Sequence, residues 1–250
     1  MAKLELRNIT KRFGKVLALD DLSLTVARGE FFVVVGPNGS GKTTLLRVIA
    51  GLVPPDSGEV YIDGEEVNDL PPAQRGVRMV FQGYALFPHL KVYDEQRFSN
   101  LNFPLKIRKF LREEIVKVIS TVTGRVGIER DLYPRKPDQL SAGQKQKVAV
   151  GRALTLVPKL FVLDEPLSNL DPLSRVKVRE EIRRIHGEIK ATTLYVTHNL
   201  PEAIALADRM AVLDHGAIQQ IGTPGEVYER PANEFVRLFI HSYDLPVRPI

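Results

Sequence analysis

The stretch GPNGSGKTT, residues 36–44, limits what this chain can fold into more than any other part of its sequence. It follows the apolar run FFVVV and leads into the segment TTLLRVIAGL, so a glycine-rich loop stands between a candidate buried strand and a candidate helix. The loop fits the pattern G-x-x-x-x-G-K-[ST], in which glycines let consecutive backbone N–H groups surround an anion and the helix start adds a positive dipole. We therefore predict that it binds the phosphates of a nucleotide. The candidate phosphate-binding residues are Gly36, Asn38, Gly39, Ser40, Gly41, Lys42, Thr43 and Thr44.

Two side chains of this loop have distinct chemical roles in the prediction. Lys42 supplies a positive charge for the β- and γ-phosphates, and the Thr43 hydroxyl is a hard oxygen ligand for Mg²⁺. The alternative, a glycine-rich turn without a ligand, is disfavoured by the strand and the helix on either side. The loop alone does not separate kinases, GTPases, helicases and transport ATPases.

A second motif, LFVLDEP at residues 160–166, ends an apolar run in two carboxylates. Asp164, at the end of the candidate strand, is placed to hold Mg²⁺ through water, opposite Thr43. Glu165 beside it can orient and polarise an attacking water, which indicates hydrolysis rather than transfer to a second substrate. An acidic pair without catalytic function is the alternative, and the phosphate-binding loop makes it the weaker one.

A third motif, LSAGQ at residues 140–144, precedes the helix-period segment KQKVAVGRAL. Ser141 is a candidate helix N-cap. A helix start after a turn of small residues is also an anion site, so the sequence predicts a second phosphate-binding helix start.

Composition restricts the class of protein. The chain has 250 residues, of which 44% are apolar and 26% charged, which is typical of a globular domain with a sizeable core. Without cysteines it has no disulfide, thiolate zinc site or cysteine nucleophile. The formal charge is +5, but basic residues are dispersed among acids, so we expect a solvated surface and no nucleic-acid partner. The histidines show no metal-ligand spacing, which disfavours zinc or iron; they are His89, His186, His198, His215 and His241.

No segment has the features of a secretory signal or of a membrane span. The N-terminal stretch MAKLELRNITKRFGK has scattered charges and no long apolar core. No apolar run approaches the roughly 18 residues that a spanning helix needs. We expect a cytoplasmic chain that does not itself cross a membrane.

Short apolar runs alternate with helix-period segments, which predicts an α/β fold around a mainly parallel sheet. The clearest helix runs from Ser174 to Lys190, where apolar residues recur at helical spacing. The strand candidates are Phe31 to Val35, Val60 to Ile62, Val77 to Phe81, Leu160 to Leu163, Thr193 to Val196 and Met210 to Leu213.

The rest of the chain suggests two additions to this core. The segment LELRNITKRFGKVLALDDLSLTV alternates apolar and polar residues on both sides of a turn, which predicts an antiparallel β layer. Between Phe87 and Leu140 helical spacing takes over, with Pro134 to Asp138 as the return linker. The predicted organisation is an ATP-binding core of residues 1–86 and 141–230, a helical subdomain of residues 87–140 and a tail of residues 231–250.

In this order along one chain, these motifs resemble those of the ATP-binding subunit of an ABC transporter, over nearly the whole length. GPNGSGKT resembles the first phosphate motif of that family, LSAGQ its signature motif and LFVLDEP its metal-binding and catalytic strand. SNLD at residues 168–171 resembles the D-loop, Gln82 in VFQGYALFPHL the Q-loop and His198 in YVTHNLPEA the switch histidine. A single Gln or His alone is more often a core or surface residue, so the order of the motifs carries the resemblance.

The resemblance implies a P-loop NTPase fold of the ABC ATPase type, with ATP and Mg²⁺ as ligands. It implies a head-to-tail dimer, in which the signature helix of one subunit covers ATP bound to the other. It also implies a role for each matching residue. Phe13 would stack on adenine, and phosphates and Mg²⁺ would be bound by Lys42, Thr43, Asp164 and Gln82. Glu165 would act as general base, with His198 and Gln82 as further catalytic residues. The partner's ATP would be contacted by Ser141, Gly143 and Gln144, and Asp171 would couple the two sites. Phe13 could equally pack onto a core.

Two departures from the family pattern stand out. Ala142 occupies a position where the signature usually has glycine, and we expect a modest effect because Ser141 and Gly143 remain. The segment Glu95 to Ser99 is an apparent insertion in the region that would face a membrane partner.

The segment IGTPGEVYERPANEFVRLFI resembles the importer branch that serves sugars, polyamines, ferric iron or oxyanions. That implies a dimer with an identical or related ATP-binding subunit, transmembrane permease subunits and, indirectly, a solute-binding protein, at the cytoplasmic face of the membrane. The segment YALFPHL could receive a short permease helix, or be ordinary core. The tail resembles the lead-in to a regulatory domain, and we expect residues 231–250 to be poorly supported without it.

Two other functions compete with the importer. A soluble ABC ATPase acting on DNA or ribosomes would resemble two fused copies or carry a long coiled coil or a zinc insert, and the sequence has none of these. A P-loop kinase is disfavoured by LSAGQ and by the adjacent Asp164 and Glu165.

Overall fold

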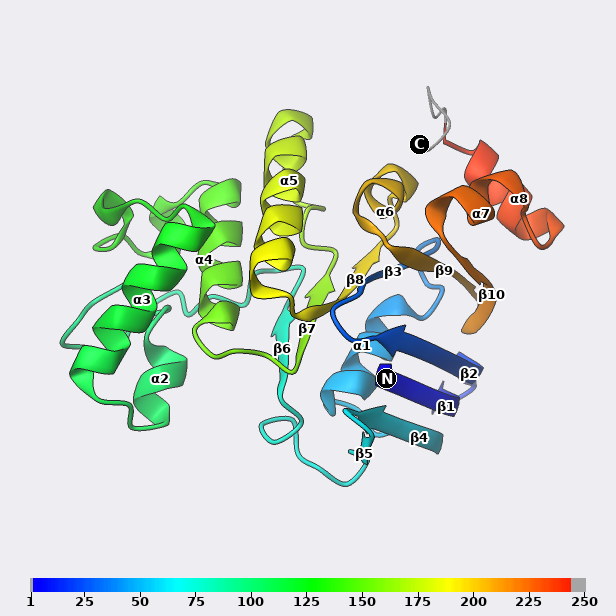
Figure 1. Ribbon diagram of the computed structural model, residues 1–250, viewed down its shortest axis with the longest axis horizontal. Helices are drawn as coiled ribbons and strands as arrows, with labels where there is room; N and C mark the ends of the chain where they lie inside the picture. Colours follow the sequence, from blue (N-terminus) through cyan, green and yellow to red (C-terminus); the bar gives the residue numbers. More distant parts are fainter. Residues whose placement is uncertain (1, 244–250) are drawn as a thin grey trace. The chain divides into compact units, whose positions relative to one another are not determined.

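The computed structural model describes residues 2–243. The chain forms two compact units (Figure 1), and each is described by itself. Unit 1 comprises Met1–Met79, Lys159–Glu165 and Ile189–Ile250, and unit 2 comprises Val80–Pro158 and Pro166–Glu188, as far as these ranges are described.

A six-stranded sheet dominates unit 1, with the strand order β10-β9-β3-β8-β7-β6. β3 runs parallel to β8 and β9, and β7 runs parallel to β8, whereas β10 is antiparallel to β9. Every residue of β3, β7 and β8 is buried, as in strands covered on both faces. The bounds are β3 Phe31–Val35, β6 Val77–Val80, β7 Leu160–Asp164, β8 Thr192–Thr197, β9 Arg209–Asp214 and β10 Ala217–Gly222. The predicted parallel core is confirmed.

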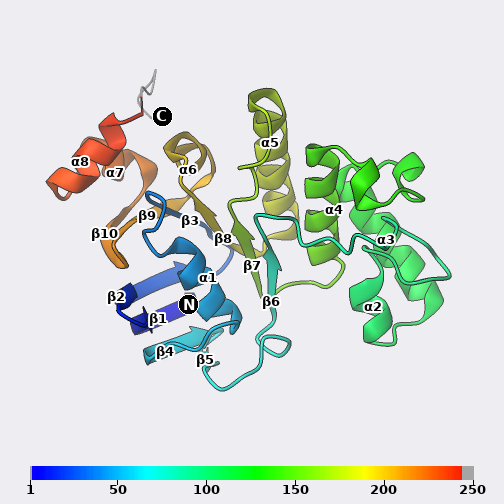
Figure 2. The ribbon, with the colours of Figure 1, turned by 180° about the vertical axis from the view of Figure 1, so that it is seen from behind.

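A second, antiparallel sheet has the order β2-β1-β4-β5 and confirms the predicted β layer. Its strands are β1 Ala2–Phe13, β2 Val16–Ala27, β4 Ser57–Ile62 and β5 Glu65–Glu66. Helix α1, Lys42–Ala50, contacts β2 of this sheet and β7 and β8 of the larger one, so it lies between them (Figures 1 and 2). The helix ends at Ala50 and Gly51 caps it with a φ of 75°, so the helix stops before the last two residues of the segment TTLLRVIAGL.

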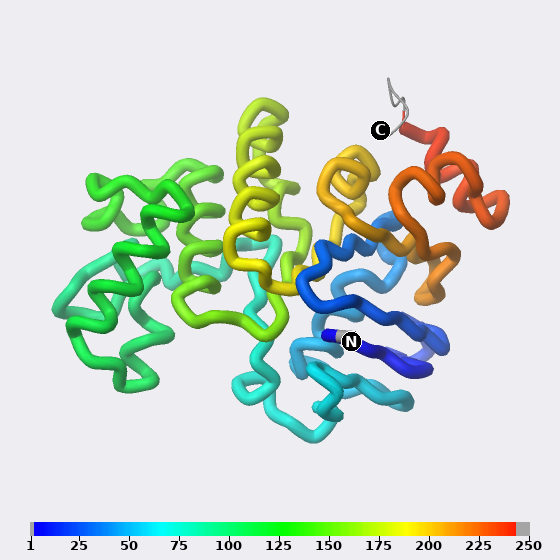
Figure 3. The backbone as a smooth tube through the Cα atoms, viewed as in Figure 1, coloured from blue at the N-terminus to red at the C-terminus, as the bar shows by residue number. Residues whose placement is uncertain are grey.

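The last part of unit 1 differs from two expectations. β10, which the strand candidates did not include, contacts β2, so segments from opposite ends of the sequence lie side by side (Figure 3). Residues 231–243 are well supported, because Val236 and Ile240 of helix α8 are buried. The expectation of a poorly supported tail is wrong for these residues; residues 244–250 lie outside the described part. The helices here are α6 Leu200–Leu206, α7 Pro224–Glu229 and α8 Glu234–His241.

Unit 2 is helical, as predicted for its central part. Helix α5 begins at Pro172 and ends at Ile189, so the predicted helix from Ser174 to Lys190 is confirmed with shifted ends. Part of the predicted linker is itself a short 3-10 helix, Pro137–Gln139. The remaining helices are α2 Phe103–Ile107, α3 Arg112–Val126, the 3-10 helix Arg130–Leu132 and α4 Ala142–Leu154.

The grouping of helices is wider than the predicted helical subdomain of residues 87–140, because α4 and nearly all of α5 belong to unit 2. Packing explains why α4 belongs to unit 2. A Cβ on its Gly151 would lie 3.0 Å from Ile128 Cδ1 and 3.3 Å from a Leu101 methyl, so the helix sits close against the central segment. The predicted domain boundaries stay a prediction.

Within residues 2–243, we find no helix with the length and apolar character of a membrane span.

Candidate active site

Strand register brings the predicted motifs of unit 1 to one edge of the large sheet. Val35, the last residue of β3, pairs with Thr197, and Asp164 pairs with Val196. Because these strands are parallel, the segments that follow them leave the sheet at the same edge. The phosphate-binding loop, the Asp164–Glu165 pair and His198 are therefore neighbours in space.

Two glycines of the loop are required by the chain's own packing. A Cβ on Gly36 would lie 2.1 Å from the Leu213 carbonyl oxygen. A Cβ on Gly41 would lie 2.4 Å from the Ala18 carbonyl oxygen, and the φ of Gly41 is 104°, which favours glycine. The loop is thus pressed against its surroundings and can turn sharply into α1.

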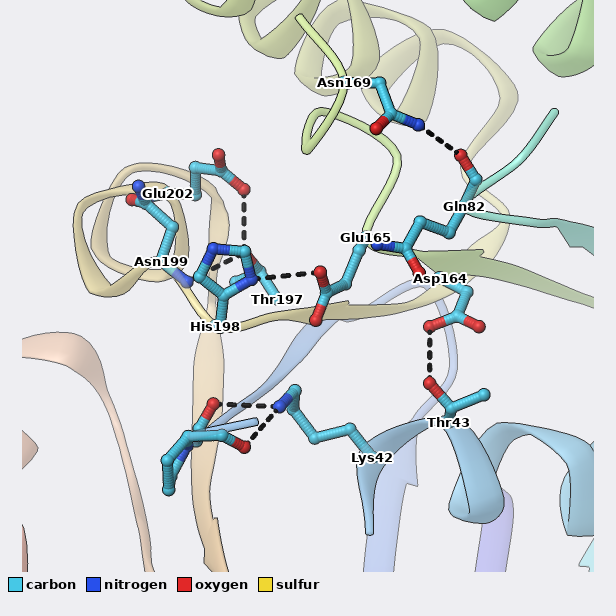
Figure 4. A network of polar contacts seen from close by, with 12 residues as sticks. Lys42, Thr43, Gln82, Asp164, Glu165, Asn169, Thr197, His198, Asn199 and Glu202 are labelled. Atoms are coloured by element: carbon cyan, nitrogen blue, oxygen red, sulfur yellow. Dashed lines mark hydrogen bonds and ion pairs between the residues drawn. The ribbon is translucent and has the colours of Figure 1, made fainter. Parts of the chain in front are cut away.

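Lys42 reaches back across this loop (Figure 4). Its Nζ donates hydrogen bonds to the carbonyls of Gly36 at 2.9 Å and Pro37 at 2.8 Å. Burial lowers the pKa of Lys42, against the opposing effect of the Glu165 and Asp164 carboxylates. An ammonium carries three N–H groups, so one more bond can reach an anion at the loop.

A second donor in the loop is the Ser40 hydroxyl. It is buried and has no hydrogen-bond partner within the described residues. A buried polar group without a partner costs free energy, and a phosphate oxygen would satisfy this one. The loop therefore fits the phosphate groups that the sequence predicts.

Asp164 and Thr43 form the candidate metal site. Thr43 Oγ1 donates to Asp164 Oδ1 at 3.3 Å, and Asp164 is only 4% exposed. Burial raises the pKa of Asp164, while the Thr43 hydrogen bond opposes the rise. A cation would offset the cost of this buried carboxylate.

The donor set fits Mg²⁺ rather than a metal with an all-protein cage. No group of three or more His, Cys, Asp or Glu that could hold a metal ion occurs within residues 2–243. Mg²⁺ in nucleotide sites typically takes one or two protein oxygens and completes its shell with waters and phosphate oxygens.

Glu165 and His198 form a direct pair. His198 Nδ1 lies 2.9 Å from Glu165 Oε2, with side chains 44% and 12% exposed, respectively. Glu165 has a left-handed backbone with a φ of 43°, and its N–H donates to the Val196 carbonyl at 2.9 Å. Such strain in a residue other than glycine is typical of functional sites. The sequence predicted both residues but not this contact.

A buried polar network supports the connection that carries His198, and sequence reasoning missed it. Glu202 Oε2 accepts hydrogen bonds from Tyr195 and Thr197, each at 2.9 Å. Asn199 caps α6 by accepting from the Glu202 N–H at 3.0 Å. The run Asn-Leu-Pro-Glu is a recognisable helix start and could have indicated this cap.

In unit 2, the predicted residues of the Q-loop and D-loop have local partners. The Gln82 carbonyl accepts from Asn169 Nδ2 at 3.0 Å (Figure 4). The Asp171 carboxylate accepts from the Ser174 N–H at 3.0 Å in the first turn of α5, and hydrogen bonds from Ser174 lower its pKa. The roles predicted for Gln82 and Asp171 in nucleotide binding and coupling stay predictions.

Ser141 caps α4, as predicted, in a reciprocal capping box. The Gln144 N–H donates to Ser141 Oγ at 3.3 Å, and the Ser141 N–H donates to Gln144 Oε1 at 2.9 Å. Ala142 is the first residue of the helix. A hollow of about 260 Å³ opens here, and its wall includes Ser141, Gly143, Gln144, Lys147 and Lys177. The two lysines outnumber the one carboxylate of the wall, Glu129, which suits an anion.

Phe13 is 47% exposed, which argues against a core position, and its ring lies 5.6 Å from Lys11 Nζ. Adenine stacking by Phe13 stays a prediction.

The segment YALFPHL is half exposed rather than core. Arg152 of α4 donates to the carbonyls of Tyr84 and Ala85, and Phe87 packs on Phe103 with ring centroids 4.5 Å apart. Its predicted use as a permease contact stays a prediction.

The apparent insertion from Glu95 to Ser99 is a loop that side-chain contacts hold in place. Lys106 Nζ donates to the carbonyls of Gln96 and Arg97, and Arg112 forms an ion pair with Glu95 at 2.7 Å.

Comparison with known proteins identifies the family of this chain. The family model for the ABC transporter matches residues 19–168. The trehalose/maltose import ATP-binding protein MalK of Thermococcus litoralis is 47% identical over 248 residues, covering 97% of this chain and 65% of the relative. The sn-glycerol-3-phosphate import ATP-binding protein UgpC of Cupriavidus necator is 48% identical over 251 residues, covering 100% of this chain and 67% of the relative. The chain thus spans about two thirds of the length of these relatives.

Among solved structures, a dimeric ATP-binding cassette in a post-hydrolysis state, bound to ADP and Pi, matches with a TM-score of 0.74 and 30% identity. The match covers 88% of this chain and 98% of that one. Family model, relatives and solved structure agree with the motifs and with the fold. The chain belongs to the ABC transporter family, and within it resembles the ATP-binding subunits of importers.

Proposed function

We propose that this chain is the ATP-hydrolysing motor subunit of an ABC importer. ATP closes a head-to-tail dimer, the closed dimer drives separate membrane subunits, and hydrolysis reopens it. The observation that carries the proposal is the contact of Glu165 with His198 at the sheet edge where Lys42 and Asp164 also lie.

The proposed hydrolysis follows from the positions of these side chains. Lys42, Ser40 and the N–H groups at the start of α1 bind the phosphates. Thr43 and Asp164 would hold Mg²⁺, which would neutralise charge on the phosphate oxygens, and Gln82 stays the predicted further ligand. Glu165 accepts a proton from the attacking water as general base. His198 contacts Glu165 through Nδ1 and contacts the γ-phosphate.

The second half of each site comes from another subunit in this proposal. Ser141, Gly143 and Gln144 reach the γ-phosphate of ATP bound to the partner, and Asp171 couples the two sites. The hollow beside Ser141 and the capped start of α4 support this role. The partner is an identical or a related ATP-binding subunit.

The proposed membrane partners are permease subunits, which a solute-binding protein supplies with solute. The motor lies peripherally at the cytoplasmic face of the membrane and binds no nucleic acid. The similarity to import ATP-binding proteins for trehalose/maltose and for sn-glycerol-3-phosphate supports an importer.

Phosphate release tests the enzyme assignment. With ATP and Mg²⁺ but no added acceptor, the parent chain should release phosphate, which a kinase would not do. Glu165→Gln should reduce the rate by about 100-fold or more, because general base catalysis contributes on that order. Glu66→Gln, at an exposed position of β5, is the matched control and should retain the parent rate. Equal rates for Glu165→Gln and the parent would overturn the assignment of the base.

A pull-down from detergent-solubilised membranes of the source cell tests the importer assignment. We expect the tagged chain to recover a polytopic permease. Recovery of ribosomal or DNA-repair proteins, with the chain absent from membranes, would leave the ATPase and overturn the transport function.

A further inference from the structure

The backbone of His198 is bound by a residue far along the chain. Tyr243, just after α8, donates its hydroxyl hydrogen to the His198 carbonyl, with the two oxygens 2.5 Å apart. This contact reaches the short connection between β8 and α6, in which His198 lies.

The packing of α8 and of the Tyr243 ring holds this hydroxyl in place. α8 is anchored by Val236 and Ile240, which are 0% and 3% exposed. Behind the helix end, the Tyr243 N–H donates to the Ile240 carbonyl at 3.3 Å. The Tyr243 ring also packs edge-on against Phe239, with centroids 5.8 Å apart. The hydroxyl is thus held at a fixed place relative to the core of unit 1.

The hydrogen bonds on either side of His198 use other groups, and the His198 carbonyl accepts from Tyr243. The Asn199 N–H donates to Thr197 Oγ1 at 3.0 Å, and Thr197 in turn donates to Glu202. These bonds fix the end of β8 and the start of α6. Tyr243 adds the restraint on His198 itself, whose ring faces Glu165.

We propose that Tyr243 is a positioning residue that holds the His198 backbone so that the imidazole stays against Glu165. This inference rests on the proposed hydrolysis at Glu165 and adds a role for the segment after α7, which the family motifs do not include. Burial raises the pKa of Tyr243, so the phenol remains a neutral donor at physiological pH.

Tyr243→Phe tests the proposal, because it removes the hydroxyl and keeps the ring. We expect kcat for ATP hydrolysis to fall about three- to tenfold, the usual effect of losing one hydrogen bond, with KM for ATP unchanged. Tyr61→Phe makes the same chemical change on the antiparallel sheet of unit 1, where the hydroxyl donates to Glu59, and should leave kcat unchanged. An unchanged kcat in Tyr243→Phe, or an equal fall in both variants, would overturn the proposal.

The ring of His198 gives a readout that does not depend on turnover. In ¹H–¹⁵N spectra of histidine-labelled protein, Tyr243→Phe should shift the imidazole signals of His198 and leave those of His89, His186 and His215 in place. Unshifted His198 signals would contradict the positioning role even if the chain were inactive. If instead the parent chain releases no phosphate while His198 shifts, the proposed function fails and the positioning contact stands.

Discussion

At the scale of single residues, the site is built from charges that folding removes from water. Lys42 and Asp164 are 5% and 4% exposed. Burial lowers the pKa of Lys42 and raises that of Asp164, so it favours the neutral form of each. Neither charge is favourable for the folded chain by itself. Both become useful when phosphates and Mg²⁺ bind, which is how a binding site differs from a stable core.

Asp164→Asn should therefore raise the free energy of unfolding while lowering the apparent Mg²⁺ affinity in ATP hydrolysis. The pKa of Asp164 is higher in the folded chain than in the unfolded one, so its protonated form favours folding. The contribution of Asp164 to the free energy of unfolding is fully present below its unfolded pKa of about 4, and it is lost as the pH rises through its folded pKa. At pH 7 the neutral asparagine avoids this loss, and Asn Oδ1 still accepts from Thr43.

Urea unfolding of Asp164→Asn and of the parent at several pH values measures the effect. The variant should be the more stable at pH 7, and its advantage should shrink toward pH 4. Its apparent Mg²⁺ affinity in ATP hydrolysis should fall about tenfold or more. Asp69→Asn, at an exposed position, is the control. A stability difference that does not change with pH would contradict burial as the cause.

The sequence predicted the residues of the site better than their partners. Lys42, Asp164, Glu165 and His198 follow from motifs, and their proximity follows from parallel strands that end at one edge. The bond from Tyr243 to His198 joins residues that no local pattern relates, because it depends on how α8 packs.

At the scale of elements, helix starts carry both stability and function. α4 and α7 begin with the same reciprocal capping box, formed by Ser141 with Gln144 and by Thr223 with Glu226. The two boxes are chemically alike, but only the first borders the hollow that we assign to the partner's ATP.

Ser141→Ala and Thr223→Ala separate these two contributions. Each should lower the free energy of unfolding by about 1 kcal/mol, the usual cost of losing a hydroxyl cap. Only Ser141→Ala should also weaken ATP-dependent dimer formation, measured by sedimentation in the Glu165→Gln background. Equal dimer formation by both variants would show that Ser141 acts as a cap alone.

The predictability of the elements follows their burial. The strands with continuous apolar runs were predicted within one or a few residues of their observed ends, since both of their faces are covered. β10, with the sequence AIQQIG, is a half-exposed edge strand without such a run and was missed. The polar pattern of an edge strand is hard to tell from a loop.

At the scale of the whole molecule, each unit contains residues to which the proposal assigns a role. Unit 1 contains the phosphate-binding loop, the Asp164–Glu165 pair and His198, whereas unit 2 contains Gln82 and the signature residues. The order of motifs along the sequence was sufficient to predict the family. The close packing of α4 against Ile128 and Leu101 at Gly151 was not predictable, because no local pattern relates these residues.

Sedimentation of Glu165→Gln with and without ATP tests the central claim most directly. Closure needs the γ-phosphate and opening needs hydrolysis, so the variant should be a monomer without ATP and a stable dimer with it. ADP should not support the dimer, and adding Lys42→Ala, which weakens phosphate binding, should abolish it. A variant that remains monomeric at saturating ATP would contradict the ATP-closed, head-to-tail motor.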